Sequence, residues 1–292
     1  MVVMFSKKKV HMADQAQQGT LFDEQAKPTP FAGIMVGCAG WSLSSAVQPR
    51  FPGAGSHLER YAQVLPAVEI NSSFYRPHKP STYARWRDSV PPGFRFSLKL
   101  PREITHERRL RDIAEPVTVF LDAASQLADR FGCLLVQMPP SLAFDQETAT
   151  ALFGRLRERL GAGIACEPRH QSWFGDEATE LLARFQVGRV LADPQVAVDP
   201  KPALYQELVY VRLHGSPVIY HSDYPEDCLR RNAAWLARQQ RQGREVWCIF
   251  DNTASGAAVP NALTTLALTD AYRADQRGGA GAGPGGGGGG LG

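Results

Sequence analysis

Long apolar runs and closely spaced cysteine pairs are both missing from this sequence. No apolar stretch approaches the roughly 20 residues that a membrane-spanning helix needs, and the five cysteines include no C-x-x-C pair. We therefore expect no membrane contact, and buried reduced thiols rather than disulfides or a zinc site, as is typical of a cytoplasmic protein. The first apolar residues precede Lys7 and are too few for a signal peptide, and Met12 is an alternative start.

Glycine motifs for nucleotide binding are also missing. No G-x-G-x-x-G follows an apolar run and no G-x-x-x-x-G-K-[ST] occurs, which excludes the usual dinucleotide and P-loop sites. Flavin and pyridoxal phosphate need no such motif, so the cofactor stays unknown. The net charge of +3 is too small to indicate nucleic acid by itself, and it leaves nucleic-acid binding open.

Two polar tails flank one long central region. Residues 1–30 are rich in glutamine and residues 277–292 are mostly glycine, so we expect both tails to be disordered. The remaining residues, 31–276, match the roughly 250 residues of one (β/α)8 barrel. In the first tail, Gln18, Leu21 and Phe22 resemble the pattern with which bacterial proteins bind the sliding clamp, although such a short match can arise by chance.

Eight short apolar runs alternate with longer helical patterns, which is the rhythm of parallel strands joined by crossover helices. The predicted strands are Ile34–Cys38, Ala67–Asn71, Phe94–Leu100, Cys133–Met138, Ile164–Glu167, Arg189–Ala192, Leu208–His214 and Val246–Phe250. The predicted helices are His57–Leu65, Ser81–Val90, Pro116–Phe131, Gln146–Leu160, Glu177–Phe185, Glu226–Gln242 and Asn261–Arg273. This order predicts an α/β fold, a single TIM-type (β/α)8 barrel.

The alternation of side chains along each strand separates an inner from an outer face. In the third strand Phe94, Phe96 and Leu98 share the face that must meet the helices, so Lys99 points into the barrel. The same reasoning turns a polar set inward at the ends of the strands: Glu69, Asn71, Lys99, Gln137, Glu167, Arg169, Arg212 and His214. The alternation assigns no face to Asp193, Asp251 and Asn252.

The inward set predicts a polar pocket at the C-terminal mouth, where barrels of this type keep their active sites. The alternative is an ion-pair network that neutralises itself and binds no substrate. The segment 101–115 carries four arginines and His106, and it is either a lid over an anion or a solvated loop. Aromatic side chains beside cations, including Tyr75, suit a ring-bearing or sugar-like anion.

The strand ends carry eight segments that follow a known pattern: Gly37–Trp41, Val68–Arg76, Phe96–Lys99, Ile104–His106, Leu135–Ser141, Glu167–Phe174, Tyr210–Gly215 and Asp251–Thr253. They resemble the YecE-like family, catalogued as domain of unknown function seventy-two. The resemblance implies a TIM-type barrel with a polar pocket at its C-terminal mouth and no established reaction. The chain departs from the family at residues 42–51, where further Tyr and Trp are common, and at Asp251 and Asn252, where the family often has paired asparagines.

The first functional hypothesis is an enzyme that uses acid–base chemistry on a small anionic substrate, phosphorylated or sugar-like, without a redox cofactor. Glu69 and Glu167 are the candidate acid and base, His214 a proton shuttle, and Lys99 an anion ligand or a Schiff-base nucleophile. The arginines would bind the anion, because the geometry of a guanidinium group matches that of a carboxylate or a phosphate. The predicted substrate-binding residues are Asn71, Tyr75, Gln137, Arg169, Trp173, Arg212, Asp251 and Asn252.

Two other functions fit the same residues. A metal-dependent phosphoesterase linked to nucleic acid would use Glu69, Glu167, His214 and Asp251 as ligands of a divalent metal. Because no dense motif such as H-x-x-x-H occurs and nearby Lys and Arg would repel a cation, we do not favour a tightly bound metal. A non-catalytic ligand-binding barrel predicts instead a ligand that copurifies unchanged.

Overall fold

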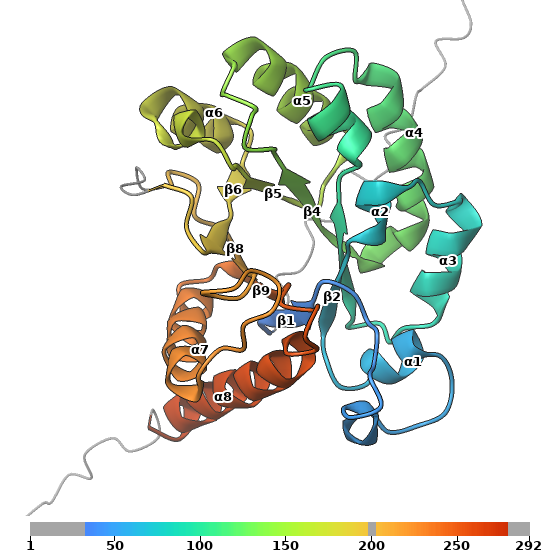
Figure 1. Ribbon diagram of the computed structural model, residues 1–292, viewed down its shortest axis with the longest axis vertical. Helices are drawn as coiled ribbons and strands as arrows, with labels where there is room; N and C mark the ends of the chain where they lie inside the picture. The colour runs from blue at the N-terminus through green and yellow to red at the C-terminus, as the bar shows by residue number, and fades with distance from the viewer. Residues whose placement is uncertain (1–32, 198–202, 280–292) are drawn as a thin grey trace, which may run out of the picture.

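Parallel strands form the wall of a barrel in the computed structural model, which describes residues 33–197 and 203–279 (Figure 1). They are β1 (Met35–Cys38), β2 (Ala67–Ile70), β3 (Arg95–Lys99), β4 (Phe131–Gln137), β5 (Gly163–Glu167), β6 (Val187–Arg189), β7 (Leu191–Asp193), β8 (Leu208–Leu213) and β9 (Glu245–Phe250). The order in the sheet is β6-β5-β4-β3-β2-β1-β9-β8-β7. The predicted TIM-type barrel is confirmed.

The sixth predicted strand is broken into two short ones. We predicted one strand at residues 189–192, whereas the structure has β6 on β5 and β7 on β8, with Val190 between them. The amide of Val190 still donates to the carbonyl of Cys166 at 2.8 Å. A Cβ at Gly188 would come within 2.8 Å of the carbonyl oxygen of Leu208. Because glycine has no side chain, β6 can approach β8, and this approach closes the ring.

Helices cover the outside of the ring (Figure 1): α1 (His57–Tyr61), α2 (Ser72–Tyr75), α3 (Pro80–Asp88), α4 (Ala114–Ala124), α5 (Gln146–Arg159), α6 (Asp176–Arg184), α7 (Glu226–Arg241) and α8 (Ala258–Gly279). Four short turns join them: η1 (Gln48–Arg50), η2 (Glu103–Glu107), η3 (Ser125–Arg130) and η4 (Gln171–Phe174). The predicted helix 116–131 is wrong in its second half, because Ala128 has a φ of 48° and interrupts it, and Phe131 already belongs to β4.

Two apolar layers follow from the alternation along the strands. The outer layer, between strands and helices, contains Val36, Val68, Leu98, Val136 and Val211 among many others. The inner layer fills the ring with Met35, Ala67, Cys133, Leu135, Ala165, Val190, Leu208, Tyr210, Trp247 and Ile249. On most strands an inward polar residue comes two positions after an inward apolar one, so the polar set caps the C-terminal end of a filled barrel.

The two predicted tails lie largely outside the described residues. The predicted first tail, with Gln18, Leu21 and Phe22, lies outside them, so the clamp contact stays a prediction. At the other end α8 continues past the predicted Arg273 to Gly279, inside the segment predicted as a tail. None of the helices in the described ranges combines the length and the apolar character needed to cross a membrane.

Candidate functional site

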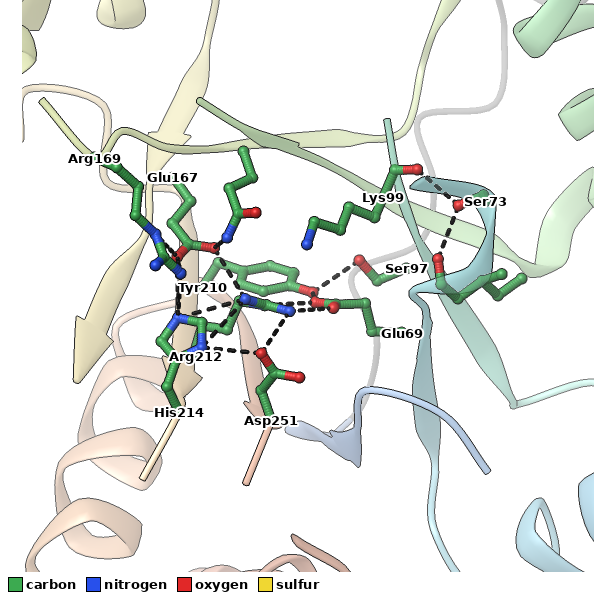
Figure 2. Close-up of polar contacts among 12 residues, drawn as sticks. Glu69, Ser73, Ser97, Lys99, Glu167, Arg169, Tyr210, Arg212, His214 and Asp251 are labelled. Carbon is green, nitrogen blue, oxygen red and sulfur yellow. Dashed lines mark hydrogen bonds and ion pairs between the residues drawn. The ribbon is translucent and has the colours of Figure 1, made fainter. Parts of the chain in front are cut away.

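A buried arginine near the end of β8 organises the mouth of the barrel (Figure 2). Arg212 donates from Nε to Glu69 Oε2 at 3.0 Å and from Nη2 to Glu69 Oε1 at 2.7 Å. Its Nη1 donates to Glu167 Oε2 at 3.2 Å, and Nη2 lies 3.0 Å from Asp251 Oδ2. Burial opposes the charge, but the three carboxylates outweigh it and raise the pKa of Arg212 well above its usual value. Each nitrogen of Arg212 therefore already has a carboxylate partner.

Glu167, at the end of β5, has both carboxylate oxygens occupied. Oε1 accepts from Arg169 Nε and Nη2 at 3.0 and 2.6 Å, and Oε2 accepts from Arg212 and from Gln137 Nε2 at 3.1 Å. Burial opposes ionisation, but Arg212, His214 and Arg169 hold the pKa of Glu167 well below its usual range. Glu167 is thus an ionised carboxylate without a free lone pair for substrate.

His214 lies between two carboxylates. Its Nδ1 is 2.9 Å from Asp251 Oδ2 and its Nε2 is 3.0 Å from Glu167 Oε1. A carboxylate only accepts, so both contacts are hydrogen bonds when the ring carries a proton on each nitrogen, as an imidazolium. Arg169 Nη2 also lies 3.1 Å from Nε2. Burial opposes this charge, but the hydrogen bonds to Asp251 and Glu167 raise the pKa of His214 above 6.5.

Lys99, at the end of β3, is a buried cation of another kind. Its side chain is nearly enclosed, at 5% exposure, and its Nζ lies 4.2 Å from the centre of the Phe74 ring. Within the described part of the chain the ammonium makes no hydrogen bond and no ion pair. Burial and the charge of Arg212 lower the pKa of Lys99 to about 8, against the pull of the carboxylates. Both protonation states are therefore accessible near neutral pH.

The charges of this cluster balance without Lys99. The carboxylates of Glu69, Glu167 and Asp251 carry three negative charges, which the two arginines and His214 cancel when the His214 ring is protonated. Lys99 adds one positive charge whenever it is protonated. In the described residues, Asp251 makes its contacts through Oδ2 alone, so its Oδ1 is a carboxylate oxygen of the cluster without a partner. The self-neutralising network that we considered as an alternative exists, but Lys99 lies outside it.

The floor of the site contains Tyr210 and Ser97, which are not among the predicted site residues. Tyr210 Oη donates to Glu69 Oε2 at 3.0 Å and lies 2.8 Å from Ser97 Oγ. Both share the inward face of Arg212 and Lys99, so the alternation rule could have placed them. At the rim the centres of the His106 and Phe74 rings lie 4.9 Å apart, with the two rings nearly perpendicular. Burial and the charge of Lys99 lower the pKa of His106 to about 4.

Three predicted substrate-binding residues do not join the cluster. Trp173 is fully buried and donates from Nε1 to the carbonyl of Leu142 at 2.9 Å, so it packs the wall behind β5. Asn252 donates to the carbonyl of Ser222 and to Asn261, both at 2.9 Å, and joins loops outside the ring. Tyr75, the last residue of α2, is 66% exposed. The strand rule does not reach them, because all three lie beyond the ends of the strands.

Asn71 and Gln137 have different surroundings. Gln137 donates to Glu167 and so belongs to the cluster. Asn71 begins α2, and its Oδ1 is buried without a hydrogen-bond partner in the described residues. Across those residues, no group of three or more His, Cys, Asp or Glu side chains is arranged to hold a metal ion. A divalent cation at the mouth would have to displace Arg212 or His214 from the carboxylates.

Residues 35–280 match the model of a family described as protein of unknown function DUF72. The chain belongs to the DUF72 family. The resemblance of the strand ends is thereby confirmed. Over 176 residues this DUF72 chain is 32% identical to the UPF0759 protein YecE of Escherichia coli K12, a match that covers 58% of this chain and only 62% of YecE. It is 22% identical over 267 residues to the UPF0759 protein YunF of Bacillus subtilis 168, covering 81% of this chain and 95% of YunF.

Two solved DUF72 structures share the fold. The protein from Enterococcus faecalis V583 superposes with a TM-score of 0.68 at 22% identity, over 82% of this chain and 96% of that chain. The protein from Thermotoga maritima MSB8 gives a TM-score of 0.68 at 24% identity, over 82% of this chain and all of that chain. These likenesses support the barrel and carry no information on its reaction.

Proposed function

We propose that this DUF72 chain is an enzyme that performs acid–base chemistry on a small anionic substrate at the mouth of the barrel, with Lys99 as the group that exchanges a proton. The observation that carries the proposal is the ammonium of the buried residue Lys99, which has no carboxylate partner in the described residues, beside a network whose carboxylates already have cationic partners. A buried charge without a partner is costly, and an anionic substrate would supply the partner.

The chemical role of each residue in the cluster depends on whether its polar atoms already have hydrogen-bond partners. A pKa of about 8 lets Lys99 both give and take a proton near neutral pH, which suits a general acid or base. Asp251 Oδ1 is the available carboxylate oxygen, so Asp251 takes the role first predicted for Glu69 and Glu167. Those two carboxylates hold Arg212 instead. Arg169 uses Nε and Nη2 on Glu167, which leaves Nη1 for the anionic group of the substrate.

The test compares Lys99→Met with Lys79→Met across a panel of sugar phosphates, hydroxy acids and 2-oxo acids. Thermal shift reports binding, and proton NMR reports turnover. We expect Lys99→Met to lose about 100-fold or more of the turnover, as for a removed general acid or base. Lys79 precedes α3, outside the cluster, so Lys79→Met should keep the wild-type rate. Equal rates in the two variants would refute the role of Lys99, and a ligand that binds unchanged would indicate a non-catalytic barrel.

A carbonyl substrate allows a covalent variant of this proposal. The neutral amine of Lys99 would attack the carbonyl carbon, and loss of water from the carbinolamine would leave a Schiff base. Borohydride added during turnover would then reduce the imine to a stable secondary amine on Lys99, which mass spectrometry of the digest locates. Turnover of a carbonyl compound without any adduct on Lys99 would leave proton transfer as its role.

A further inference from the structure

A cavity of about 440 Å³ lies at the rim, apart from the charged cluster. Its walls come from α2 and η2, which follow β2 and β3, and from the neighbouring helices α3 and α4, which lie beside these strands in Figure 1. Phe74 belongs to both places, because its ring contacts Lys99 Nζ at 4.2 Å and also lines the cavity. The volume falls in the range of pockets that hold small molecules.

The cavity offers both apolar surface and one available cation. Tyr75 and Val119, in its wall, are 66% and 58% exposed, so the cavity presents both an aromatic and an aliphatic side chain to a ligand from solvent. Two wall arginines are paired, Arg102 with Glu107 at 3.0 Å and Arg108 with Glu103 at 2.8 Å.

The side chain of Arg76 has no ion pair or hydrogen bond in the described residues, and neither has the carboxylate of Glu115. Glu115 lies in the first turn of α4, where the helix dipole stabilises a negative charge. Arg76 is therefore the charge that a ligand would complement, and that ligand would carry a negative group. The buried hydroxyl of Tyr83, in the same wall, also has no hydrogen-bond partner in the described ranges.

The backbone of this wall is strained. The segment that we predicted as a lid or a solvated loop forms a π-helical turn, η2, a conformation often found at functional sites. Arg109, Leu110 and Asp112 follow with φ values of 50°, 68° and 49°, which non-glycine residues rarely adopt. The buried Leu110 holds the loop there, donating its amide to the carbonyl of Ile104 at 3.0 Å. Strain of this kind concentrates at ligand sites.

We propose that this cavity is a second binding site, for a planar aromatic ring that bears one anionic group. The ring lies against Tyr75 and Val119, and the anion meets Arg76. The proposal is independent of any catalytic role for Lys99, because it concerns binding alone.

The test uses anilinonaphthalene sulfonate, a fluorescent aromatic anion, and phenylnaphthylamine, which has the same rings without the sulfonate. We expect saturable binding of one sulfonate molecule per folded chain, weakened about tenfold by Tyr75→Ala. The sulfonate should bind about tenfold more tightly than the uncharged probe, and Arg76→Gln should abolish that difference. Near-UV circular dichroism checks that each variant is folded.

A matched pair of variants locates the probe. Val119→Glu places a negative charge in the cavity wall, whereas Val218→Glu makes the same change at a valine of similar exposure, 57%, on the loop after β8. Loss of binding in Val119→Glu alone supports the site. Loss in Val218→Glu alone, or binding that neither change affects, would overturn it, as would the absence of saturable binding.

Discussion

Two buried cations at one mouth have opposite surroundings. Arg212 is 1% exposed and contacts three carboxylates, whereas Lys99 is 5% exposed and contacts an aromatic ring. Burial is almost the same, yet the pKa of Arg212 is raised and that of Lys99 is lowered to about 8. Burial opposes the charge of both side chains, so the contacts with carboxylates, rather than depth, decide the direction in which each pKa shifts. The same comparison separates the cation that holds the site together from the one that is available for chemistry.

The chemistry of the two side chains agrees with this division. The planar guanidinium of Arg212 has five donors and stays charged, which suits a position that must join carboxylates from β2, β5 and the end of β9. The ammonium of Lys99 is a single titratable point, and its pKa shifts readily on burial. Exchanging the two residues would not preserve either role.

The largest expected effect comes from removing the central cation. Arg212→Met leaves Glu69, Glu167 and Asp251 buried close together with one cation fewer, so we expect a loss of about 3–5 kcal/mol in the free energy of unfolding. Urea denaturation at pH 7 measures it. The control is Arg231→Met, which removes a solvent-exposed pair with Asp227 and should change the free energy of unfolding far less than Arg212→Met does. If Arg212→Met lowers the free energy of unfolding by less than about 1 kcal/mol, Arg212 does not hold the site together and the contrast with Lys99 is wrong.

Removing Lys99 should have the opposite sign. Lys99→Met deletes a buried charge without a carboxylate partner, so we expect greater stability at pH 7, by at most roughly 3 kcal/mol. The folded pKa of about 8 lies below the ordinary 10.5, so between these values the unfolded wild type binds more protons and its stability rises with pH relative to the variant. The advantage of Lys99→Met should therefore disappear by about pH 10.5.

The measurement is the difference in unfolding free energy between wild type and Lys99→Met from pH 7 to 10.5. Taking a difference matters because burial raises the pKa of Cys38 and Cys248 to about 12, which lowers stability as pH rises in both proteins. A difference that does not change with pH would show that Lys99 titrates normally.

A smaller effect is expected from His214, whose charge belongs to the network. His214→Gln removes two hydrogen bonds to carboxylates, with an expected cost of roughly 1.5–3 kcal/mol. Because the folded pKa is raised, this contribution is complete below pH 6.5 and is lost as pH rises through the folded value. Proton NMR from pH 5 to 9 checks the titration. His106 is the internal control, since its pKa of about 4 keeps it neutral throughout.

The barrel could be predicted because short apolar runs alternate with helical patterns along the chain. The convergence of its polar residues could be predicted because side chains alternate between the two faces of each strand. Lys99, Gln137, Glu167 and Arg212 lie in the mouth for the same reason that their apolar neighbours face the helices. The pairing within the mouth could not be predicted. It depends on side-chain rotamers and on distances across the ring, so the sequence did not show that Arg212 is occupied while Lys99 is not.

The remaining differences between the predicted site and the structure also have physical causes. Asp251 and Asn252 follow directly after β9, which ends at Phe250. The side chain of Asp251 turns into the ring, whereas that of Asn252 makes its hydrogen bonds outside the ring. The alternation along β9 does not extend to these residues, so it does not predict their directions. Trp173 lies in the turn η4, where packing against Phe144 and not strand parity sets its direction. The break at Val190 depends on the approach of β6 to Leu208, which is distant in sequence.

The smallest expected effect lies in the floor, and it tests whether the two cations are independent. Tyr210→Phe removes the hydroxyl that contacts Glu69 and Ser97, but Glu69 Oε2 keeps its bond from Arg212 Nε, so the expected cost is about 0.5–1.5 kcal/mol. The hydroxyl contacts Glu69 and Ser97 and not Lys99, so Lys99 should keep its pKa, which the pH dependence of its labelling by an amine reagent measures. If Tyr210→Phe shifts that dependence, Lys99 is coupled to the network through the floor, and the separation of a structural cation from an available one fails.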